Sequence, residues 1–493
     1  MVTTDFRRTV HKIFSSAFIA LLTLLALSAG AAAPKPNPLA EKLRGDHRPN
    51  IIFILADDLG YGDLGCYGQA KIKTPHLDQL AAEGMRFTQC YAGTTVCAPS
   101  RAALMTGRHT GHTRIRGNAA MPMGADEVCV AEVLKQAGYK TGLIGKWGLG
   151  LQNQPSTPDK KGFDEWLGYL SQTHAHNYYP TQLWRASVLD EIPLQRLALD
   201  KNAGGAKGQY AHDLFTQAAT NFVRVSKYRP FFLYLAYTIP HAHNELRELG
   251  MEVPSDAPYS RESWPQAEKN KAAMITRLDA DIGALVGELQ RLKIDTNTLI
   301  FFTSDNGPHK EGGVNPEFFQ SSGPWRGLKR DLYEGGIRVP MIARWPARIK
   351  AGAVSEQVWA LWDFLPTAAE LAGVPPPAGL DGISILPTLL GQPQTNQHEF
   401  LYWEFHEKGS KQAVRMGDWK AVRPAPRTPL ELYHLKTDLG EKQNVAAQNP
   451  EVVAKIETYL KTARTESERW PLRTAQEETA WRKANPNADK EPN

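Results

Sequence analysis

Long apolar runs alternate with helix-like segments over the first three quarters of the chain. The runs at residues 50–56, 139–144, 231–237 and 299–303 are continuous, which is typical of strands buried on both faces of a parallel sheet. Helices are predicted at 75–83, 127–137 and 267–292, the first with Thr74 as N-cap and Gly84 at its end. Strands that alternate with helices predict an α/β layered domain with a mostly parallel central sheet.

The pattern changes after the three prolines at 375–377. Short strand-like pieces follow at 400–405, 412–416, 419–423 and 430–435, and then a helix at 450–462. These pieces predict a small C-terminal α+β subdomain with an antiparallel sheet. We therefore expect a main domain at 48–375, a subdomain at 376–472 and a polar, disordered tail at 473–493. The stretches at 150–210 and 305–330 are expected to be loops that shape a pocket.

The N-terminus has the pattern of an export signal. Arg7, Arg8 and Lys12 precede an apolar run at 13–27, and small residues fill 28–33. This order predicts a Sec signal peptide at 1–33, followed by a Pro-rich linker at 34–47. The alternative is an uncleaved anchor, but the run is short for a bilayer span. We expect a periplasmic or extracellular protein without stable membrane insertion.

Composition narrows the class of protein further. A chain of 493 residues is too long for one ordinary core, and 42% hydrophobic with 22% charged residues is typical of a globular protein. The net charge of +5 argues against nucleic acid as a partner, which needs a concentrated basic face. Four cysteines are too few for a disulfide scaffold. If Cys97 takes part in chemistry, at most one disulfide can form among Cys66, Cys90 and Cys129.

Acidic and amide residues follow two of the predicted strands. Asp57 and Asp58 come directly after the first strand, and Asp305 and Asn306 follow the fourth in the same way. Ligands in open α/β sheets bind beyond the carboxyl ends of the strands. Each pair alone also fits turn and helix-cap chemistry. Together they predict a cation site, and its oxygen ligands suit Ca²⁺ or Mg²⁺ rather than zinc.

The run from Cys97 to Arg108 reads C-A-P-S-R-A-A-L-M-T-G-R. A lone Cys is usually a small buried apolar residue. This run, however, resembles the signature of the formylglycine-dependent (type I) sulfatases, Cys/Ser-x-Pro-x-Arg followed by x-x-Leu-x-Thr-Gly-Arg. The similarity extends from about Pro49 into the C-terminal subdomain. It implies an alkaline-phosphatase-like fold, a catalytic sulfatase domain at 48–375 and an arylsulfatase-like sulfuric ester hydrolase.

In that family a separate maturing enzyme oxidises the Cys of the motif to formylglycine, so the resemblance implies this fate for Cys97. A sulfated aldehyde hydrate can expel sulfate by losing its second hydroxyl proton, which divides a difficult hydrolysis into two easier steps. The resemblance also implies that Arg101 holds the formylglycine hydroxyl. The implied metal ligands are Asp57, Asp58, Asp305, Asn306 and the group derived from Cys97.

Further matches supply groups for the sulfate. Lys146, in a Gly-Lys-Trp run, and Lys329, five residues before Glu334, match the family's two sulfate-binding lysines, and His241 matches the His that protonates the leaving oxygen. The family's run has His two residues after its Lys, where this chain has Gly148. Since that His is a proton carrier, we expect His174 or His176 to replace it or to contact substrate.

The expected loops are rich in aromatic and hydrogen-bonding residues, which suit a sulfated carbohydrate as substrate. These residues are Tyr178, Tyr179, Trp184, His243, Asn244, Glu245, Trp325 and Arg326. The alternative is that these side chains only pack loops. Two rival functions stay open: a formylglycine-dependent phosphonate or phosphate ester hydrolase, and a non-catalytic relative that binds sulfated glycans.

Overall fold

The computed structural model describes residues 48–488 except 120 and 189, and these belong to one compact unit. The predicted signal peptide and linker lie outside the described residues, as do the last five residues. Within the described part, no helix combines the length and the apolar character that crossing a membrane requires.

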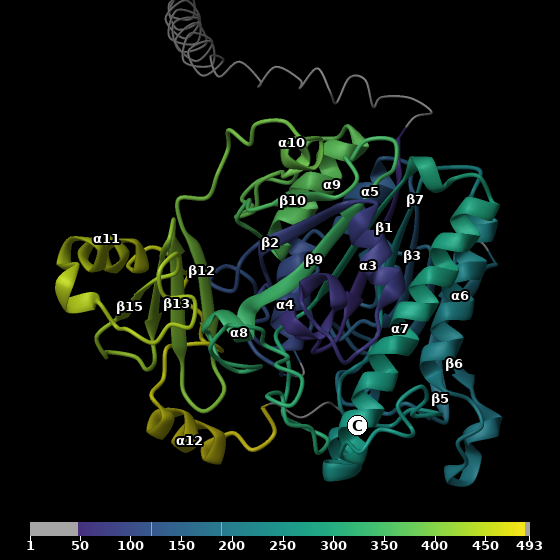
Figure 1. The fold of residues 1–493 in the computed structure, drawn as a ribbon, viewed down its shortest axis with the longest axis horizontal. Coiled ribbons are helices and arrows are strands. Elements are labelled where there is room, and N and C mark those ends of the chain that lie inside the picture. The colour runs from purple at the N-terminus through teal and green to yellow at the C-terminus, as the bar shows by residue number, and fades with distance from the viewer. Residues whose placement is uncertain (1–47, 120, 189, 489–493) are drawn as a thin grey trace, which may run out of the picture. The chain divides into compact units, whose positions relative to one another are not determined.

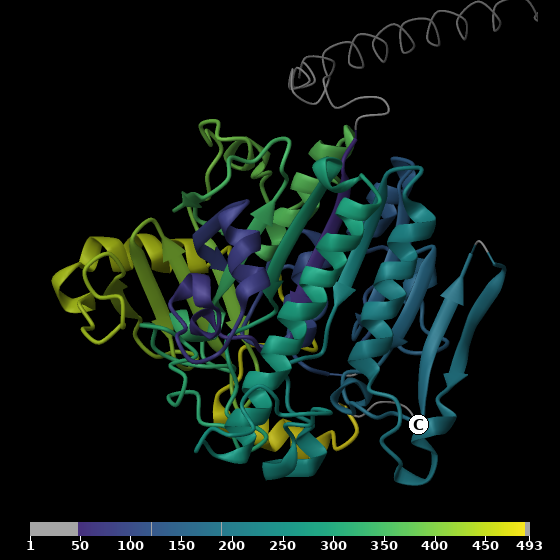
Figure 2. The ribbon, with the colours of Figure 1, turned by 45° about the vertical axis from the view of Figure 1, so that its right-hand side comes forward.

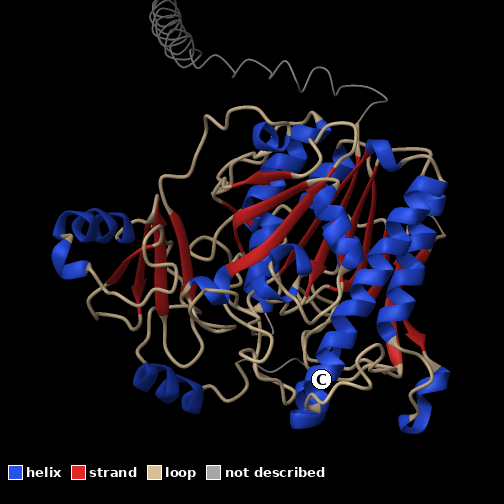
Figure 3. Ribbon diagram, viewed as in Figure 1, coloured by secondary structure: helices blue, strands red, loops and turns tan. Residues whose placement is uncertain are grey.

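A large mixed sheet forms the centre of this unit (Figures 1 and 3). Its strand order is β10-β2-β9-β8-β1-β7-β3-β4-β5-β6, and β11 pairs with β2. The five consecutive strands β8, β1, β7, β3 and β4 are parallel, whereas β9, β5 and β6 run antiparallel to their neighbours. The mostly parallel core is therefore confirmed. The bounds are β1 Asn50–Ala56, β2 Met85–Tyr91, β3 Lys140–Lys146, β4 Glu165–Tyr169, β5 Gln182–Ser187, β6 Ile192–Ala198, β7 Phe231–Ala236, β8 Thr298–Ser304, β9 Arg338–Arg344, β10 Ala353–Ser355 and β11 Trp359–Ala360.

Helices cover both faces of this sheet (Figure 2). Ile52 and Ile54 of β1 belong to a core that includes residues of α3 (Pro75–Ala82), α6 (Ala211–Ser226) and α7 (Gln266–Arg291). Phe53, between them, points to the other face, where its ring lies 4.4 Å from that of Phe364 in α9 (Phe364–Ala372). This alternation explains why β1 is apolar at every position from Ile51 to Ala56. Helices α4 (Cys97–Thr106) and α5 (Val130–Gln136) pack with α9 on this second face.

A second sheet is antiparallel, in the order β12-β13-β14-β15. One face packs against α11 (Pro450–Leu460), while the other forms a core with Tyr91, Val96 and Ala103. Trp403 belongs to that core, and its Nε1 donates a hydrogen bond to the carbonyl of Ala92 (3.0 Å). Helix α4 therefore lies between the C-terminal sheet and the α5–α9 layer. The strands are β12 Leu401–Phe405, β13 Lys411–Met416, β14 Trp419–Arg423 and β15 Glu431–His434. Two short helices are α8 Glu334–Ile337, directly before β9, and α10 Leu386–Leu389, between α9 and β12.

Two expectations about the fold were wrong. The stretch at 150–210 contains β4, β5 and β6 rather than loops alone, and the polar tail contains α12 (Ala475–Ala484). That helix begins with a capping box between Thr474 and Glu477, which stabilises a first turn without an apolar core. The stretch at 305–330 does lack helices and strands. The four cysteines are all free thiols, and no disulfide joins Cys66, Cys90 or Cys129.

Candidate functional site

The polar cluster lies at the carboxyl ends of four adjacent parallel strands, β8, β1, β7 and β3. Ala56 of β1 pairs with Ser304 of β8, so the residues that follow each strand lie side by side. The backbone N–H of Asp58 donates to Oδ1 of Asp305 (3.2 Å), which links the two predicted ligand pairs directly. The structure thus brings together Asp57, Asp58, Asp305 and Asn306, as the sequence predicted, and each of them is almost fully buried.

Cys97 is the first residue of α4 and is 2% exposed. Its Sγ lies 3.3 Å from Oδ1 of Asp57. Arg101, one turn later on the same face of the helix, donates a hydrogen bond through Nε to Oδ2 of Asp305 (3.0 Å). Its Nη2 forms ion pairs with that oxygen (2.8 Å) and with Oδ2 of Asp57 (3.4 Å). Its Nη1 donates to the carbonyl of Lys146 (3.1 Å). The spacing of Cys and Arg in the motif therefore directs a thiol and a guanidinium at the same carboxylates.

Two buried lysines, from different parts of the chain, reach the acidic cluster. Nζ of Lys146 lies 2.7 Å from Oδ2 of Asp57, and Nζ of Lys329 lies 2.8 Å from Oδ2 of Asp58. Lys329 also donates to Nε2 of His241 (3.0 Å), and that nitrogen is 3.5 Å from Asp58. With Arg101, these lysines give the site three permanent cations facing three carboxylates. The lysines predicted to bind sulfate therefore contact the carboxylates predicted to bind the metal ion.

Burial and these charges shift the proton affinities of the cluster. Burial alone raises the pKa of Asp57, but Lys146 and Arg101 outweigh it and hold that pKa well below its ordinary value. Burial, together with the charge on Asp57, raises the pKa of Asp305 to about 7. Burial and Lys329 hold the pKa of His241 well below its ordinary value. Such a concentration of shifted groups in one place is typical of a catalytic site.

The residues fit a divalent cation. Oδ1 of Asn306 is buried and has no hydrogen-bond partner among the described residues, while its Nδ2 donates to Oδ1 of Asp58 (2.6 Å). A buried oxygen without a partner is costly, and a cation would satisfy it. Asp57, Asp58, Cys97 and His241 have candidate ligand atoms within 4.8 Å of one another. Both nitrogens of His241 are engaged, however, with Lys329 and with the carbonyl of Ala242 (2.6 Å), which leaves the oxygen ligands.

The two candidate histidines behave differently. The ring of His176 stacks on that of His241, with centroids 4.7 Å apart and an interplanar angle of 12°. His174 instead packs edge-on against Tyr169, with centroids 5.0 Å apart. The structure therefore brings His176, but not His174, to the cluster.

Most of the aromatic residues expected to face a sugar are buried in packing. Tyr178 is fully buried and donates to the carbonyls of Thr238 (2.9 Å) and His241. Trp184 is 7% exposed, and Trp325 is covered by the guanidinium of Arg338 at 3.9 Å from its ring centre. Tyr178, Trp184 and Trp325 therefore pack within the fold, as the alternative interpretation of these aromatic residues expected.

The sequence offered no signal for a chain of charges beside Lys329. Oε2 of Glu311 lies 3.5 Å from Nζ of Lys329, and Arg330 bridges Glu311 (2.6 Å) to Glu407 (2.8 Å). Glu407 follows β12, so the C-terminal sheet is connected to Lys329 through three successive ion pairs. Contacts between residues this far apart in sequence leave no local pattern.

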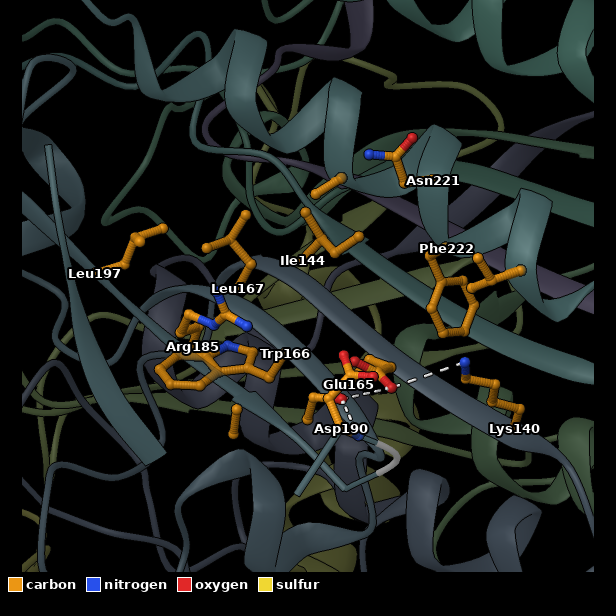
Figure 4. A pocket seen from close by; sticks show the side chains of 14 residues that line it. Lys140, Ile144, Glu165, Trp166, Leu167, Arg185, Asp190, Leu197, Asn221 and Phe222 are labelled. Carbon is orange, nitrogen blue, oxygen red and sulfur yellow. Dashed lines mark hydrogen bonds and ion pairs between the residues drawn. The ribbon is translucent and has the colours of Figure 1, made fainter. Parts of the chain in front are cut away.

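A separate cavity of about 480 Å³ lies between α6 and strands β3 to β6 (Figure 4). Its wall is mostly apolar, with Ile144, Leu167 and Phe222, and Lys140 pairs with Glu165 at 3.7 Å at one end. None of the residues of the acidic cluster lines it, so we assign it no part in the chemistry.

Comparisons with known proteins agree with this geometry. The Sulfatase family model matches residues 49–374, and the model for the C-terminal part of N-sulphoglucosamine sulphohydrolase matches 326–467. The chain is 33% identical to N-acetylgalactosamine-6-sulfatase of Canis lupus familiaris, over 93% of this chain and 86% of that protein. It is 35% identical to human arylsulfatase A, over 87% and 88% of the two chains.

A solved structure shares the same fold. Ps i-CgsB, described in complex with k-i-k-neocarrahexaose, superimposes with a TM-score of 0.74 at 32% identity, over 89% of this chain and 98% of that one. The match spans both sheets, since it covers nearly the whole described chain. The Sulfatase family model matches the main domain, and the relatives match over most of the length. The chain therefore belongs to the sulfatase family and is a sulfuric ester hydrolase.

Proposed function

We propose that this sulfatase hydrolyses sulfate esters of a carbohydrate, through a formylglycine made from Cys97 and with one bound Ca²⁺. The observation that carries the proposal is the convergence of Cys97 and Arg101, from one buried helix, on Asp57 and Asp305. The carbohydrate class is supported by the relatives, whose names specify N-acetylgalactosamine-6-sulfate and a carrahexaose. Small aryl sulfates are expected to serve as surrogate substrates.

Formylglycine, when present at position 97, supplies an aldehyde hydrate as an oxygen nucleophile. Asp57 lies within contact of that position, and Arg101 is held by Asp305 so that its guanidinium stays beside it. Because Cys97 is 2% exposed, the formylglycine-generating enzyme must reach it before the chain has folded. That enzyme is the one protein partner we propose.

The ion would be held by Asp57, Asp58, Asp305 and Asn306, together with the group at position 97. These are hard oxygen donors, which Ca²⁺ prefers, with Mg²⁺ as the alternative. The bound ion supplies Lewis acidity and orients the sulfate oxygens. The orphan Oδ1 of Asn306 supports this assignment independently of the carboxylates.

Lys146 and Lys329 are proposed to hold the sulfate, and His241 to protonate the leaving oxygen. Both ammonium groups are buried, and burial strengthens their attraction for a transferring oxyanion. Nδ1 of His241 donates to the carbonyl of Ala242, so Nε2, next to Lys329, is the atom that carries a transferred proton. His174 lacks this placement, and we no longer assign it to the substrate.

The remaining predictions concern the whole chain. We propose that residues 1–33 direct export to the periplasm or the medium, that 48–375 form the catalytic domain and that 376–472 form the subdomain. The core shared by Trp403, Val96 and Ala103 means that the subdomain contributes to the setting of Cys97. We propose that the two act as one catalytic unit.

The test is a turnover screen with protein made beside a formylglycine-generating enzyme. Mass analysis of the peptide containing Cys97 comes first, then sulfated galactose and N-acetylgalactosamine saccharides, an aryl sulfate, and phosphate and phosphonate esters. We expect sulfate release to be fastest on a saccharide. Equal or faster turnover of phosphorus esters would favour the phosphonate hydrolase, and binding without turnover by verified formylglycine protein would favour the glycan-binding relative.

A further inference from the structure

The position of the family's second proton-carrying His is filled in this chain by another side chain. Gly148 has a φ of 72°, and a Cβ added there would lie 2.0 Å from Nε2 of Gln172. That amide donates to the carbonyl of Gly148 (3.1 Å) and so is fixed in this place. An amide has no proton to exchange near neutral pH, so the proton carrier must come from elsewhere.

His176 has the geometry of an oriented base. Its Nδ1 lies 3.1 Å from Oε1 of Glu245, and its side chain is 16% exposed. Because the carboxylate accepts the Nδ1 proton, the lone pair of a neutral imidazole is on Nε2. Within the described residues, Nε2 makes no hydrogen bond. The carboxylate thus plays the part of the orienting third group in a nucleophile–base arrangement.

The ring of His176 stands within the electrostatic field of the site. It stacks on His241, which touches Lys329 and Asp58. Burial lowers the pKa of His176, and the charge of Lys146 lowers it further, which favours the neutral ring. The charged residue that lowers the pKa of His174 is instead Arg196, on the edge strand β6. The lysines of the site therefore act on His176 and not on His174.

We propose that His176, oriented by Glu245, accepts the proton that is lost when sulfate leaves, a role that rests on the proposed function above. In this step the O–H bond of the remaining hydroxyl at position 97 breaks and its proton passes to Nε2 of His176. The electron pair of that bond becomes the second C–O bond of the aldehyde. The bond from carbon to the sulfate oxygen breaks, and its pair leaves with sulfate. Glu245 is a positioning residue, since it acts only through the imidazole.

The groups that face His176 are Glu245, His241, Lys146 and Lys329, with His243 beyond Glu245 at 3.7 Å from Oε2. Glu245 raises the pKa of His176, and the two lysines lower it. Removing the carboxylate therefore shifts the titration of His176 to lower pH and frees the tautomer. The pH dependence of sulfate release would follow this shift only if His176 takes the proton in that step, which a merely structural pair would not produce.

The experiment compares His176→Ala, His174→Ala and the exposed-surface control His76→Ala in rapid-mixing assays with an aryl sulfate. Each variant is first checked by mass for formylglycine at position 97 and by circular dichroism for its fold. We expect His176→Ala to release one equivalent of phenol in a burst and then to turn over at least about 10²-fold more slowly than wild type. Its intact mass should rise by one SO₃ group during turnover, whereas His76→Ala should show neither change.

A second test uses the variant Glu245→Gln, whose pH dependence and histidine tautomers are measured. We expect the pH profile of the slow phase to begin its rise at lower pH, and ¹⁵N spectra of histidine-labelled protein to show His176 with mixed tautomers instead of one. Steady turnover without a mass increase in His176→Ala would overturn the proposal, as would a burst in His174→Ala. Wild-type protein with verified formylglycine but without sulfate release would instead contradict the proposed function itself.

Discussion

The Sγ atom of Cys97 lies 3.3 Å from Oδ1 of Asp57, so the first residue of a buried helix touches the first carboxylate after the central strand. Replacement of Cys97 by Ala removes the atom from which the nucleophile is made. We expect turnover to fall by about 10³-fold or more, because the other groups of a catalytic unit cannot act alone.

The same variant should keep its fold. Removing one buried sulfur costs about 1–2 kcal/mol, which is small for a chain of this size. Thermal unfolding followed by circular dichroism measures this, with Cys129→Ala, at another buried cysteine, as the matched control. Residual sulfatase activity near wild type in Cys97→Ala would contradict the central role of this residue.

Removal of divalent ions should abolish turnover reversibly. The oxygen ligands fit Ca²⁺, so we expect a chelator to stop hydrolysis and added Ca²⁺ to restore it. Asn306→Ala should need a higher Ca²⁺ concentration for half-maximal activity, since it removes the unpartnered oxygen. Calorimetric titration measures the shift, and Asn50→Ala, whose amide bonds Thr298 at the opposite end of β1, should leave the affinity unchanged. Full activity in chelator would disprove a catalytic ion.

Lys329→Met should harm stability as well as catalysis. The substitution leaves Asp58 buried opposite an apolar side chain, and breaking a buried ion pair costs about 3–5 kcal/mol. We expect a lower unfolding temperature in ion-free buffer and weaker binding of inorganic sulfate. A chemical unfolding curve and a sulfate competition assay separate the two effects. Unchanged sulfate affinity would remove Lys329 from the substrate site.

Glu404 should make stability depend on pH through ion pairs outside the acidic cluster. It is fully buried, its Oε1 bonds Arg116 (3.0 Å) and its Oε2 bonds Arg464 (2.8 Å). Burial raises the pKa of Glu404, but His406 and these two arginines outweigh it and hold that pKa far below its ordinary value. A lowered folded-state pKa stabilises the protein above the unfolded value of about 4.3, and this stabilisation is lost as the pH falls toward the folded value.

Glu404→Gln should therefore lower the free energy of unfolding by about 3 kcal/mol near neutral pH, and by less in acid. Urea unfolding at several pH values measures the difference in the free energy of unfolding between variant and wild type. Glu466→Gln is the matched control, because Glu466 pairs with the same Arg464 but is 86% exposed, and it should cost about 0–1 kcal/mol. If that difference in free energy does not become smaller in acid, the link between the pKa of Glu404 and stability would be contradicted.

The sequence predicted those parts of the fold that have a local cause. Strands β1, β7 and β8 are buried at every position and mostly apolar, because both faces of the sheet are covered. The alternation of Ile52, Phe53 and Ile54 between two cores shows this. Asp57 and Asp305 could be paired because both follow such strands. Strand β6 escaped prediction because it is an edge strand with mixed exposure that contains Pro193.

The parts of the site that could not be predicted depend on long-range contacts. Gln172 is significant only because it fills the space beside Gly148. His176 and His174 are equivalent in sequence, and only the placement of the turn at His174–His176 beside His241 separates them. Trp325 resembled a binding residue because its partner, Arg338, lies outside its loop, on strand β9.

Because α4 lies between the C-terminal sheet and the α5–α9 layer, it is covered only after the C-terminal sheet has been synthesised. Trp403, which helps to cover that helix, is synthesised about 300 residues after Cys97. At about 5–20 residues per second, the ribosome takes roughly 15–60 s to cover that interval. During this time strand β12, on which Trp403 lies, does not yet exist. The modifying enzyme proposed above would therefore meet Cys97 on a chain whose C-terminal cover is still being made, and the order of the sequence would give it time to act.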